Sequence, residues 1–215
     1  MVAPSPLLAR SADLSNAKRA LLDKLLANAS AAAVAPEIPR RPSGASVPLS
    51  FSQQSLWFFH QLDPQSPLYH LPIALRLAGP LNLTALQQSL NTIVARHEIL
   101  RTCYVVVDET PTQHVEPASE VPFSAIDLST QAVEGRELAV RALIDQECRR
   151  PFDLTHEPLL RALLVRTTET EHTLVLSTHH IAADGWSWGI FFRELAELYG
   201  AATAGRARRL RRVDL

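Results

Sequence analysis

Two adjacent histidines are the residues of this 215-residue sequence best suited to chemistry, because imidazole moves protons near neutral pH. His179 and His180 follow an apolar run that predicts a buried strand, and Asp184 and Gly185 precede the next predicted helix. A corner between a strand and a loop can hold side chains rigidly at a cavity. Adjacent side chains of a strand point to opposite faces, so we expect one histidine to be packed and the other to face a cleft.

Two common kinds of histidine site are not indicated. A metal centre needs at least a third ligand, and no cysteine, histidine or glutamate stands at a recognised spacing from the pair. A serine hydrolase needs a nucleophile within reach of the base, but Ser177 lies inside the predicted strand. The pair therefore favours a histidine that acts on a substrate bringing its own nucleophile.

The other six histidines are expected to have structural roles. His97 stands at the end of a predicted helix, where it favours the negative end of the helix dipole. The remaining five stand singly in predicted helix ends, loops or turns and are interpreted as surface or packing residues: His60, His70, His114, His156 and His172.

Helices and strands are intermixed in the segments that must position the pair. Ser50 is the predicted N-cap of the first helix, and a β-branched run that reaches a turn at 108–111 predicts a hairpin. The order of elements implies both hairpins and crossovers, which predicts an α+β fold, a mixed α/β sandwich with a mixed sheet flanked by helices. The predicted helices are 50–62, 84–97, 133–150 and 187–199, and the predicted strands are 71–77, 100–107, 113–116, 123–128, 159–166 and 173–178.

Composition excludes several classes of protein. With 47% hydrophobic residues, 20% charged residues and a net charge of −1, the chain is expected to be an ordinary soluble protein of the cytoplasm. No apolar run approaches the ~18 residues that a membrane-spanning helix needs, and the mildly acidic body disfavours nucleic acid as a partner. Cys103 and Cys148 are too few for a disulfide scaffold.

Three segments are expected along the chain. Residues 1–46 are rich in alanine, proline and serine, which predicts a linker, and Ser15 precedes leucines at helical spacing that predict a short amphipathic helix within it. Residues 47–200 are predicted to form the folded body. Residues 201–215 contain five arginines and are expected to be a disordered basic tail.

Three segments of the body together resemble the condensation domains of nonribosomal peptide synthetases. HHIAADG (179–185) is similar to the HHxxxDG motif of that family, SFSQQSLWF (50–58) to its opening SxAQxRLWF motif, and RHEILRTCY (96–104) to its second motif, RHExLRTxF. Ser52, Ser55 and Tyr104 stand where the family usually has alanine, arginine and phenylalanine. Three matches in the right order make the resemblance specific, whereas a lone HxxxD would occur by chance.

The resemblance implies the N-terminal lobe of a fold like that of chloramphenicol acetyltransferase, in which the active site lies in a tunnel between two lobes. The basic end, GRARRLRRVDL, does not resemble the family's continuation, so a truncated or frameshifted product is expected. The missing second lobe, or a second copy of the chain, is then the expected partner of the exposed face of this lobe.

The same resemblance implies an activity. In the family, an acyl or peptidyl thioester on one carrier protein reacts with the amine of an aminoacyl thioester on another, and an amide forms. His180 is the implied catalytic residue, either as general base for the amine or as a positioning and oxyanion-stabilising group. No G-G-x-S carrier signature occurs, so no cofactor is expected on this chain, and the substrates are expected on the phosphopantetheine of separate peptidyl or acyl carrier proteins.

The resemblance further implies a scaffold for the loop that carries His180. Asp184 is expected to form an ion pair with an arginine, with Arg96 as the first candidate and Arg101 as the second. His179 is expected to be packed, and Gly185 to allow a tight turn of the backbone. A buried ion pair of this kind would hold the geometry of the loop.

Two other functions remain open. A stand-alone acyltransferase of the same superfamily would act on a small diffusible amine or alcohol, although the residues flanking the HxxxD pattern favour the synthetase branch. An inactive fragment that only docks is the third interpretation, because half a tunnel cannot enclose two pantetheine arms. Size-exclusion chromatography would distinguish a compact monomer or dimer from an aggregated fragment.

Overall fold

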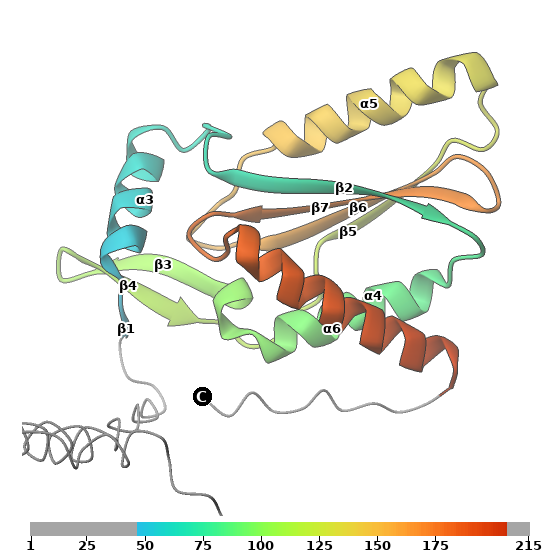
Figure 1. Cartoon of the computed structure of the whole chain (residues 1–215). Coiled ribbons are helices and arrows are strands. Elements are labelled where there is room, and N and C mark those ends of the chain that lie inside the picture. Colours follow the sequence, from blue (N-terminus) through green and yellow to red (C-terminus); the bar gives the residue numbers. More distant parts are fainter. Residues whose placement is uncertain (1–46, 206–215) are drawn as a thin grey trace, which may run out of the picture. The chain divides into compact units, whose positions relative to one another are not determined.

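The structure, a computed structural model, describes residues 47–205 (Figure 1). The predicted linker at 1–46, its helix and the arginines of the predicted tail at 201–215 lie outside this range. The start of that tail was predicted wrongly, because residues 201–203 belong to the last helix. The helices are α3 (Phe51–Leu62), α4 (Leu83–Arg96), α5 (Val133–Arg149) and α6 (Gly185–Thr203), with a 3-10 helix, η2, at Glu98–Arg101. The strands are β1 (Val47–Pro48), β2 (His70–Ala78), β3 (Thr102–Val107), β4 (Thr110–Val115), β5 (Phe123–Asp127), β6 (Leu160–Arg166) and β7 (Glu171–His179).

The strands form two sheets. The larger has the order β2-β7-β6-β5, in which β5 pairs with β6 in parallel and the other neighbours are antiparallel. The smaller has the order β1-β4-β3 and is antiparallel. Hairpins and helical crossovers both occur, which confirms the α+β class. Every predicted helix and strand within the described range is present. No helix in this range is both long and apolar enough to cross a membrane.

Local chemistry explains where the elements begin and where the predicted boundaries were wrong. Ser50 caps α3 as predicted, and the side chain of Gln53 accepts a hydrogen bond from the Ser50 N–H in return, which completes a capping box. The strand predicted from Leu100 starts only at Thr102, because η2 occupies the preceding residues. The hairpin turn between β3 and β4 needs only two residues, at 108 and 109, both with positive φ.

The larger sheet is covered on both faces. Figure 1 shows α5 across one face, and α4 and α6 across the other. Successive residues of β7 face opposite sides: Leu174 and Leu176 pack in the cluster with α4 and α6, whereas Val175 packs in the cluster with α5. Because both of its faces are buried, β7 provides a rigid support for the residues at its end.

Helix α3 is unusual because none of its residues is fully buried. Its side chains Leu56 and Trp57 pack on a small cluster, but several large apolar residues on α3, after it and at the start of α6 are exposed. Phe51 is 89% exposed and Trp186 is 85% exposed, so each of these two helices begins with a large apolar side chain in solvent. The other exposed large apolar residues on α3, after it and on the first turns of α6 are Phe58, Phe59, Leu62, Leu68 and Ile190.

Candidate functional site

The two histidines occupy the corner where β7 ends. His179 is the last residue of the strand and is 2% exposed, whereas His180 lies in the following turn and is exposed. The backbone N–H of His180 donates to the Tyr69 carbonyl at 2.8 Å, so the turn is held against the start of β2. The prediction that one ring is packed and its neighbour is exposed is confirmed, but His180 lies beyond the strand, so alternation within β7 is not the reason for its exposure.

His179 lies among other rings on the α5 side of the sheet. The ring centroids of His60, Tyr69, His70 and Phe152 lie 6.0–6.4 Å from that of His179. Burial, followed by the nearby histidines, lowers the pKa of His179 to about 3. Its Nδ1 accepts a hydrogen bond from the Ile181 N–H at 3.1 Å, which places the ring proton on Nε2. His179 is therefore a neutral structural histidine that shapes the turn.

The turn is also held from the side of the smaller sheet. Gln53 of α3 places Nε2 3.3 Å from the Ile181 carbonyl oxygen and 3.2 Å from the Tyr104 hydroxyl oxygen. The Tyr104 hydroxyl, which is fully buried, itself lies 3.4 Å from the Ile181 carbonyl oxygen. Burial raises the pKa of Tyr104, so the hydroxyl remains a donor. One residue of the first motif and one of the second therefore support the loop of the third.

These roles of Gln53 and Tyr104 were not predicted from the sequence. The motifs place Gln53 beside the N-cap of a helix and Tyr104 where the family usually has phenylalanine. Tyrosine adds a hydroxyl at a position that the fold buries, and a buried hydroxyl needs a partner. That requirement was the available signal, but the partner, Ile181, is distant in sequence and could not be identified without the fold.

The predicted pairing of Asp184 with Arg96 is wrong. Asp184 is exposed and is the N-cap of α6, where its carboxylate accepts from the Ser187 N–H at 2.8 Å and the Ser187 hydroxyl at 2.7 Å. Aspartate at a helix N-cap satisfies the unpaired N–H groups of the first turn, so the motif sequence itself supplies the partner. These hydrogen bonds from Ser187 lower the pKa of Asp184.

Arg96 and its neighbour instead contact Glu194, a residue that the sequence did not single out. Glu194 on α6 is 6% exposed and lies 3.2 Å from Arg96 Nε and 2.7 Å from His97 Nε2. Glu194 lies on the helix face that also buries Phe191 and Leu195, and a charge on an apolar face indicates a buried partner. This pairing joins the second motif to the helix that the third motif begins.

The remaining scaffold predictions have different outcomes. Arg101, the second candidate partner of Asp184, instead donates to the Glu116 carbonyl and lies 3.8 Å from Glu98. Gly185 begins α6 without a positive φ, and a Cβ there would meet no atom within 4 Å, so the turn does not require glycine. The expectation of a tight turn at this residue is wrong.

Ser187 lies in a segment, GWSWG (185–189), that has the letters of the G-x-S-x-G pattern. In hydrolases with that pattern the serine stands on a strained turn between strand and helix. Here Ser187 lies in the first turn of α6 and both donates to and accepts from Asp184. Its hydroxyl is a capping group and not a nucleophile.

A small apolar cavity of about 150 Å³ lies beside the loop between β7 and α6 (180–184, the motif loop), on the α4 and α6 side of the sheet. Thr178 of β7 and Ala182 and Ala183 of the loop line one part of it, and His97, directly after α4, and Trp188 of α6 line another. Among residues 47–205 there is no cluster of three or more potential metal ligands. The motif loop thus offers an exposed imidazole, with an apolar hollow nearby, and an imidazole in this setting suits proton transfer or hydrogen bonding.

The comparisons with known proteins agree with this arrangement of motifs. A sequence profile of the condensation domain matches residues 44–214, which is most of the chain. The chain belongs to the condensation domain family. The match includes all three motif segments, and the resemblance identified from the motifs is confirmed.

The relatives include peptide synthetases that are much longer than this chain. One component of the linear gramicidin synthase of Brevibacillus parabrevis is 42% identical over 169 residues, which cover 79% of this chain and 2% of that protein. Phosphinothricin tripeptide synthetase of Streptomyces viridochromogenes is 39% identical over 197 residues, which cover 91% of this chain and 18% of that protein. The condensation-domain chain thus spans a small part of the length of these relatives.

Solved condensation domains share its fold. The starter condensation domain of rhizomide synthetase has a TM-score of 0.72 at 22% identity, over 78% of this chain and 40% of that one. The first condensation domain of the calcium-dependent antibiotic synthetase has a TM-score of 0.69 at 28% identity, again over 78% and 40%. The chain therefore corresponds to less than half of each solved condensation-domain chain.

Proposed function

We propose that this chain is one lobe of a condensation domain that forms an amide between a carrier-bound acyl or peptidyl thioester and a carrier-bound aminoacyl amine. The observation that carries the proposal is the corner at the end of β7. There His180 is exposed while His179 is buried, and residues of the other two motifs fix the loop between them and α6. Membership of the family and the synthetases among its relatives support the same function.

The reaction needs little beyond orientation and one proton transfer. The amine nitrogen attacks the thioester carbonyl, a C–N bond forms, the C–S bond breaks, and the proton lost by the amine is balanced by protonation of the departing thiolate. Holding two tethered reactants together can supply an effective molarity on the order of 10⁵ M or more. His180 would contact the attacking amine, and the phosphopantetheine arms would belong to the carrier proteins.

Two roles for His180 follow from its exposed imidazole. As a general base it would take the proton of the amine, and as a positioning group it would only donate or accept a hydrogen bond. Glutamine retains hydrogen-bonding capacity but is not basic. A general base therefore predicts that His180→Gln is as slow as His180→Ala, and a positioning role predicts that His180→Gln keeps most of the rate.

The exposed apolar residues of α3 and α6 would face the second lobe. Phe51 and Trp186 are both more than four-fifths exposed, and large exposed apolar side chains of this kind would be covered if a partner packed on the two helices. In the chain alone these exposed residues would favour self-association. Sedimentation of the chain over a range of concentrations tests this, and a strict monomer that binds no hydrophobic dye would contradict it.

The function is testable in a chimera that joins residues 47–205 to the second lobe of a solved condensation domain. Two loaded carrier proteins supply the thioester and the amine, and amide formation is followed by mass spectrometry of the carriers. The proposal expects product only when both carriers are loaded. If a free amine or alcohol is acylated faster than the carrier-bound amine, the chain is a stand-alone acyltransferase; if a folded chimera forms no product, the proposal is wrong.

A further inference from the structure

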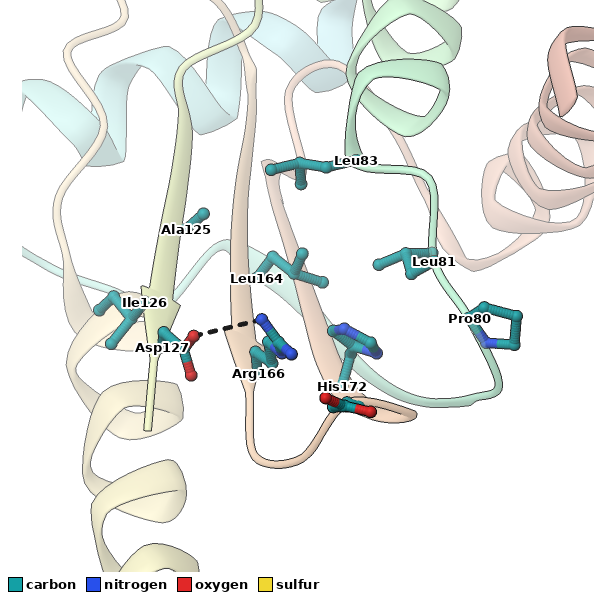
Figure 2. Close-up of a pocket in the computed structure, with 10 residues that line it drawn as sticks. Pro80, Leu81, Leu83, Ala125, Ile126, Asp127, Leu164, Arg166 and His172 are labelled. Carbon is teal, nitrogen blue, oxygen red and sulfur yellow. Dashed lines mark hydrogen bonds and ion pairs between the residues drawn. The ribbon is translucent and has the colours of Figure 1, made fainter. Parts of the chain in front are cut away.

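Hollows of different chemistry lie near the two ends of β7. The larger, of about 410 Å³, is lined by Asp127 and Arg166, which form an ion pair at 3.4 Å (Figure 2). His172 also lines it, and the stretch of β7 from His172 to His179 spans roughly 23 Å. The larger hollow therefore lies far from the motif loop, whereas the small apolar cavity lies directly beside that loop and its exposed His180.

The small cavity has a buried floor and an open rim. Leu100, Leu160 and Phe191 line it and are buried. Ala183 also lines it but is only half-buried, and Ile190 is 39% exposed. Because its walls include both buried and solvent-exposed residues, the cavity opens to the surface at the motif loop and the start of α6.

The polar side chains of the wall already have hydrogen-bond partners. The hydroxyl of Thr178 donates to a backbone carbonyl at 2.5 Å, and that of Ser187 donates to the Asp184 carboxylate at 2.7 Å. His97 Nε2 lies 2.7 Å from Glu194 Oε2. A polar group that entered the cavity would lose water without gaining hydrogen bonds from these atoms, so an apolar group is favoured.

The volume of the cavity limits the size of that group. An apolar cavity of about 150 Å³ stays dry and can bind benzene. The isobutyl group of leucine is smaller than benzene, whereas the indole of tryptophan is larger. The wall is also fixed in place, because the Trp188 ring is stacked on Phe192 with centroids 5.4 Å apart and meets Phe191 edge-on at 5.3 Å.

The chemistry of amide formation brings a side chain to this place. In an aminoacyl amine and in the last residue of a peptidyl thioester, the carbon that bears the side chain is bonded directly to the reacting nitrogen or carbonyl carbon. Thr178 stands two residues before His180 and Ala182 two residues after it, and both line the cavity. Two residues of extended chain span at most about 7 Å, so the cavity flanks the histidine that would contact the reacting atoms.

We infer that this cavity binds the apolar side chain of one reacting amino acid, with leucine as the side chain of best size. The inference rests on the function proposed above and adds a specificity pocket to it. Alanine would leave the cavity partly empty, asparagine would bury an amide of nearly the same shape as leucine without partners, and tryptophan would exceed the volume. The side chain belongs either to the acceptor amine or to the donor thioester, and separate probes distinguish the two.

The test uses the full chain and two series of probes, each with leucine, asparagine, alanine and tryptophan. Amino acid amides with a free amine represent the acceptor, and N-acetyl amino acid methyl esters represent the donor. Binding is followed by NMR titration of the Trp188 indole and the Ala183 methyl group. We expect leucine to bind at least about tenfold more tightly than asparagine and alanine in one of the series, which identifies the source of the side chain. The inference is overturned if leucine has no such advantage in either series.

Two variants change the cavity in opposite directions. Ala183→Leu adds volume at the rim and should weaken binding of the preferred leucine probe about tenfold, whereas Ile99→Ala enlarges the cavity and should raise the affinity for tryptophan relative to leucine about tenfold. Ala95→Leu is the matched control, since Ala95 is an exposed alanine on α4 that does not line the cavity. Equal effects of Ala183→Leu and Ala95→Leu, or an unchanged ratio in Ile99→Ala, contradict the inference.

The pocket and the proposed function can fail separately. In the chimera with a second lobe, leucine at the identified position should condense about tenfold faster than asparagine. Equal rates in a chimera that forms amide overturn the pocket but not the function. No amide from a folded chimera, with leucine still preferred in the binding series, overturns the function but not the pocket.

Discussion

The neutral state of His179 should make the stability of this chain depend on pH. Burial lowers the pKa of His179 from 6.5 to about 3, so the unfolded chain takes up a proton that the folded chain excludes. The stabilisation is fully present above pH 6.5 and is lost as pH falls from 6.5 towards 3. Protonation in this window favours the unfolded state, so stability rises with pH.

The size of the effect follows from the difference between the two pKa values. Each unit corresponds to about 1.4 kcal/mol, so the full difference is worth roughly 5 kcal/mol, of which about 2 kcal/mol is lost between pH 7 and pH 5. The pKa values of His60 and His70 are also lowered, mainly by burial, so both residues act in the same direction. A loss of about 2 kcal/mol is a large fraction of the stability of a small domain.

The assay is urea unfolding at pH 7, 6 and 5, followed by tryptophan fluorescence. His179→Asn removes the titrating ring but keeps an oxygen that can accept the hydrogen bond from the Ile181 N–H. We expect this variant to lose about 2 kcal/mol less than the unmodified chain between pH 7 and pH 5. His114→Gln, a change at an exposed histidine outside the cluster of rings, is the matched control. An identical pH dependence in His179→Asn and the unmodified chain would refute the reasoning.

The hydrogen bonds and ion pairs of the loop scaffold lead to three further predictions, each measured by urea unfolding at pH 7. Tyr104→Phe should cost about 1 kcal/mol, because it removes the hydroxyl that bridges Gln53 and Ile181; an unchanged stability would show that the bridge is not formed. Asp184→Ala should cost about 1 kcal/mol and Asp184→Asn almost nothing, because asparagine is also a good N-cap. The cost of Asp184→Ala should add to that of Arg96→Ala; strong coupling between the two changes would indicate an ion pair between these residues, which the structure does not contain among residues 47–205. Glu194→Ala should cost about 3 kcal/mol, because it removes the buried carboxylate that Arg96 and His97 contact. A cost below about 1 kcal/mol would contradict this buried pairing.

The fold could be predicted well from the sequence because its signals are local. Capping at Ser50, the turn before β4 and the apolar runs of β6 and β7 depend on neighbouring residues, and each is present, although β4 begins at Thr110, three residues earlier than predicted. Boundaries failed where a short segment adopts another local structure, as at η2. Propensity alone does not distinguish the last turn of a helix from the first residues of a strand.

The site could be predicted only in part, because most of its contacts join distant segments. The packed side chain of His179 follows from alternation along β7, which is a local rule. The partner of Asp184 follows from the local rule for a helix N-cap, since Ser187 is three positions away, and it was missed because the resemblance pointed to an arginine. The partner of Arg96 follows from no local rule, because Glu194 lies on another helix. The buried Arg161, which bonds Glu147 and lies over the Phe152 ring, was missed for the same reason.

The central claim is that His180 contacts the reacting amine while His179 only shapes the loop. The direct measurement is the rate of amide formation per folded molecule in the chimera with a second lobe, with both carriers loaded. We predict that His180→Ala slows the reaction about 10²-fold, that His179→Asn changes mainly the folded fraction, and that the exposed control His156→Ala has no effect. If His180→Ala leaves the rate unchanged while His179→Asn abolishes it in folded protein, the assignment of the two histidines is wrong.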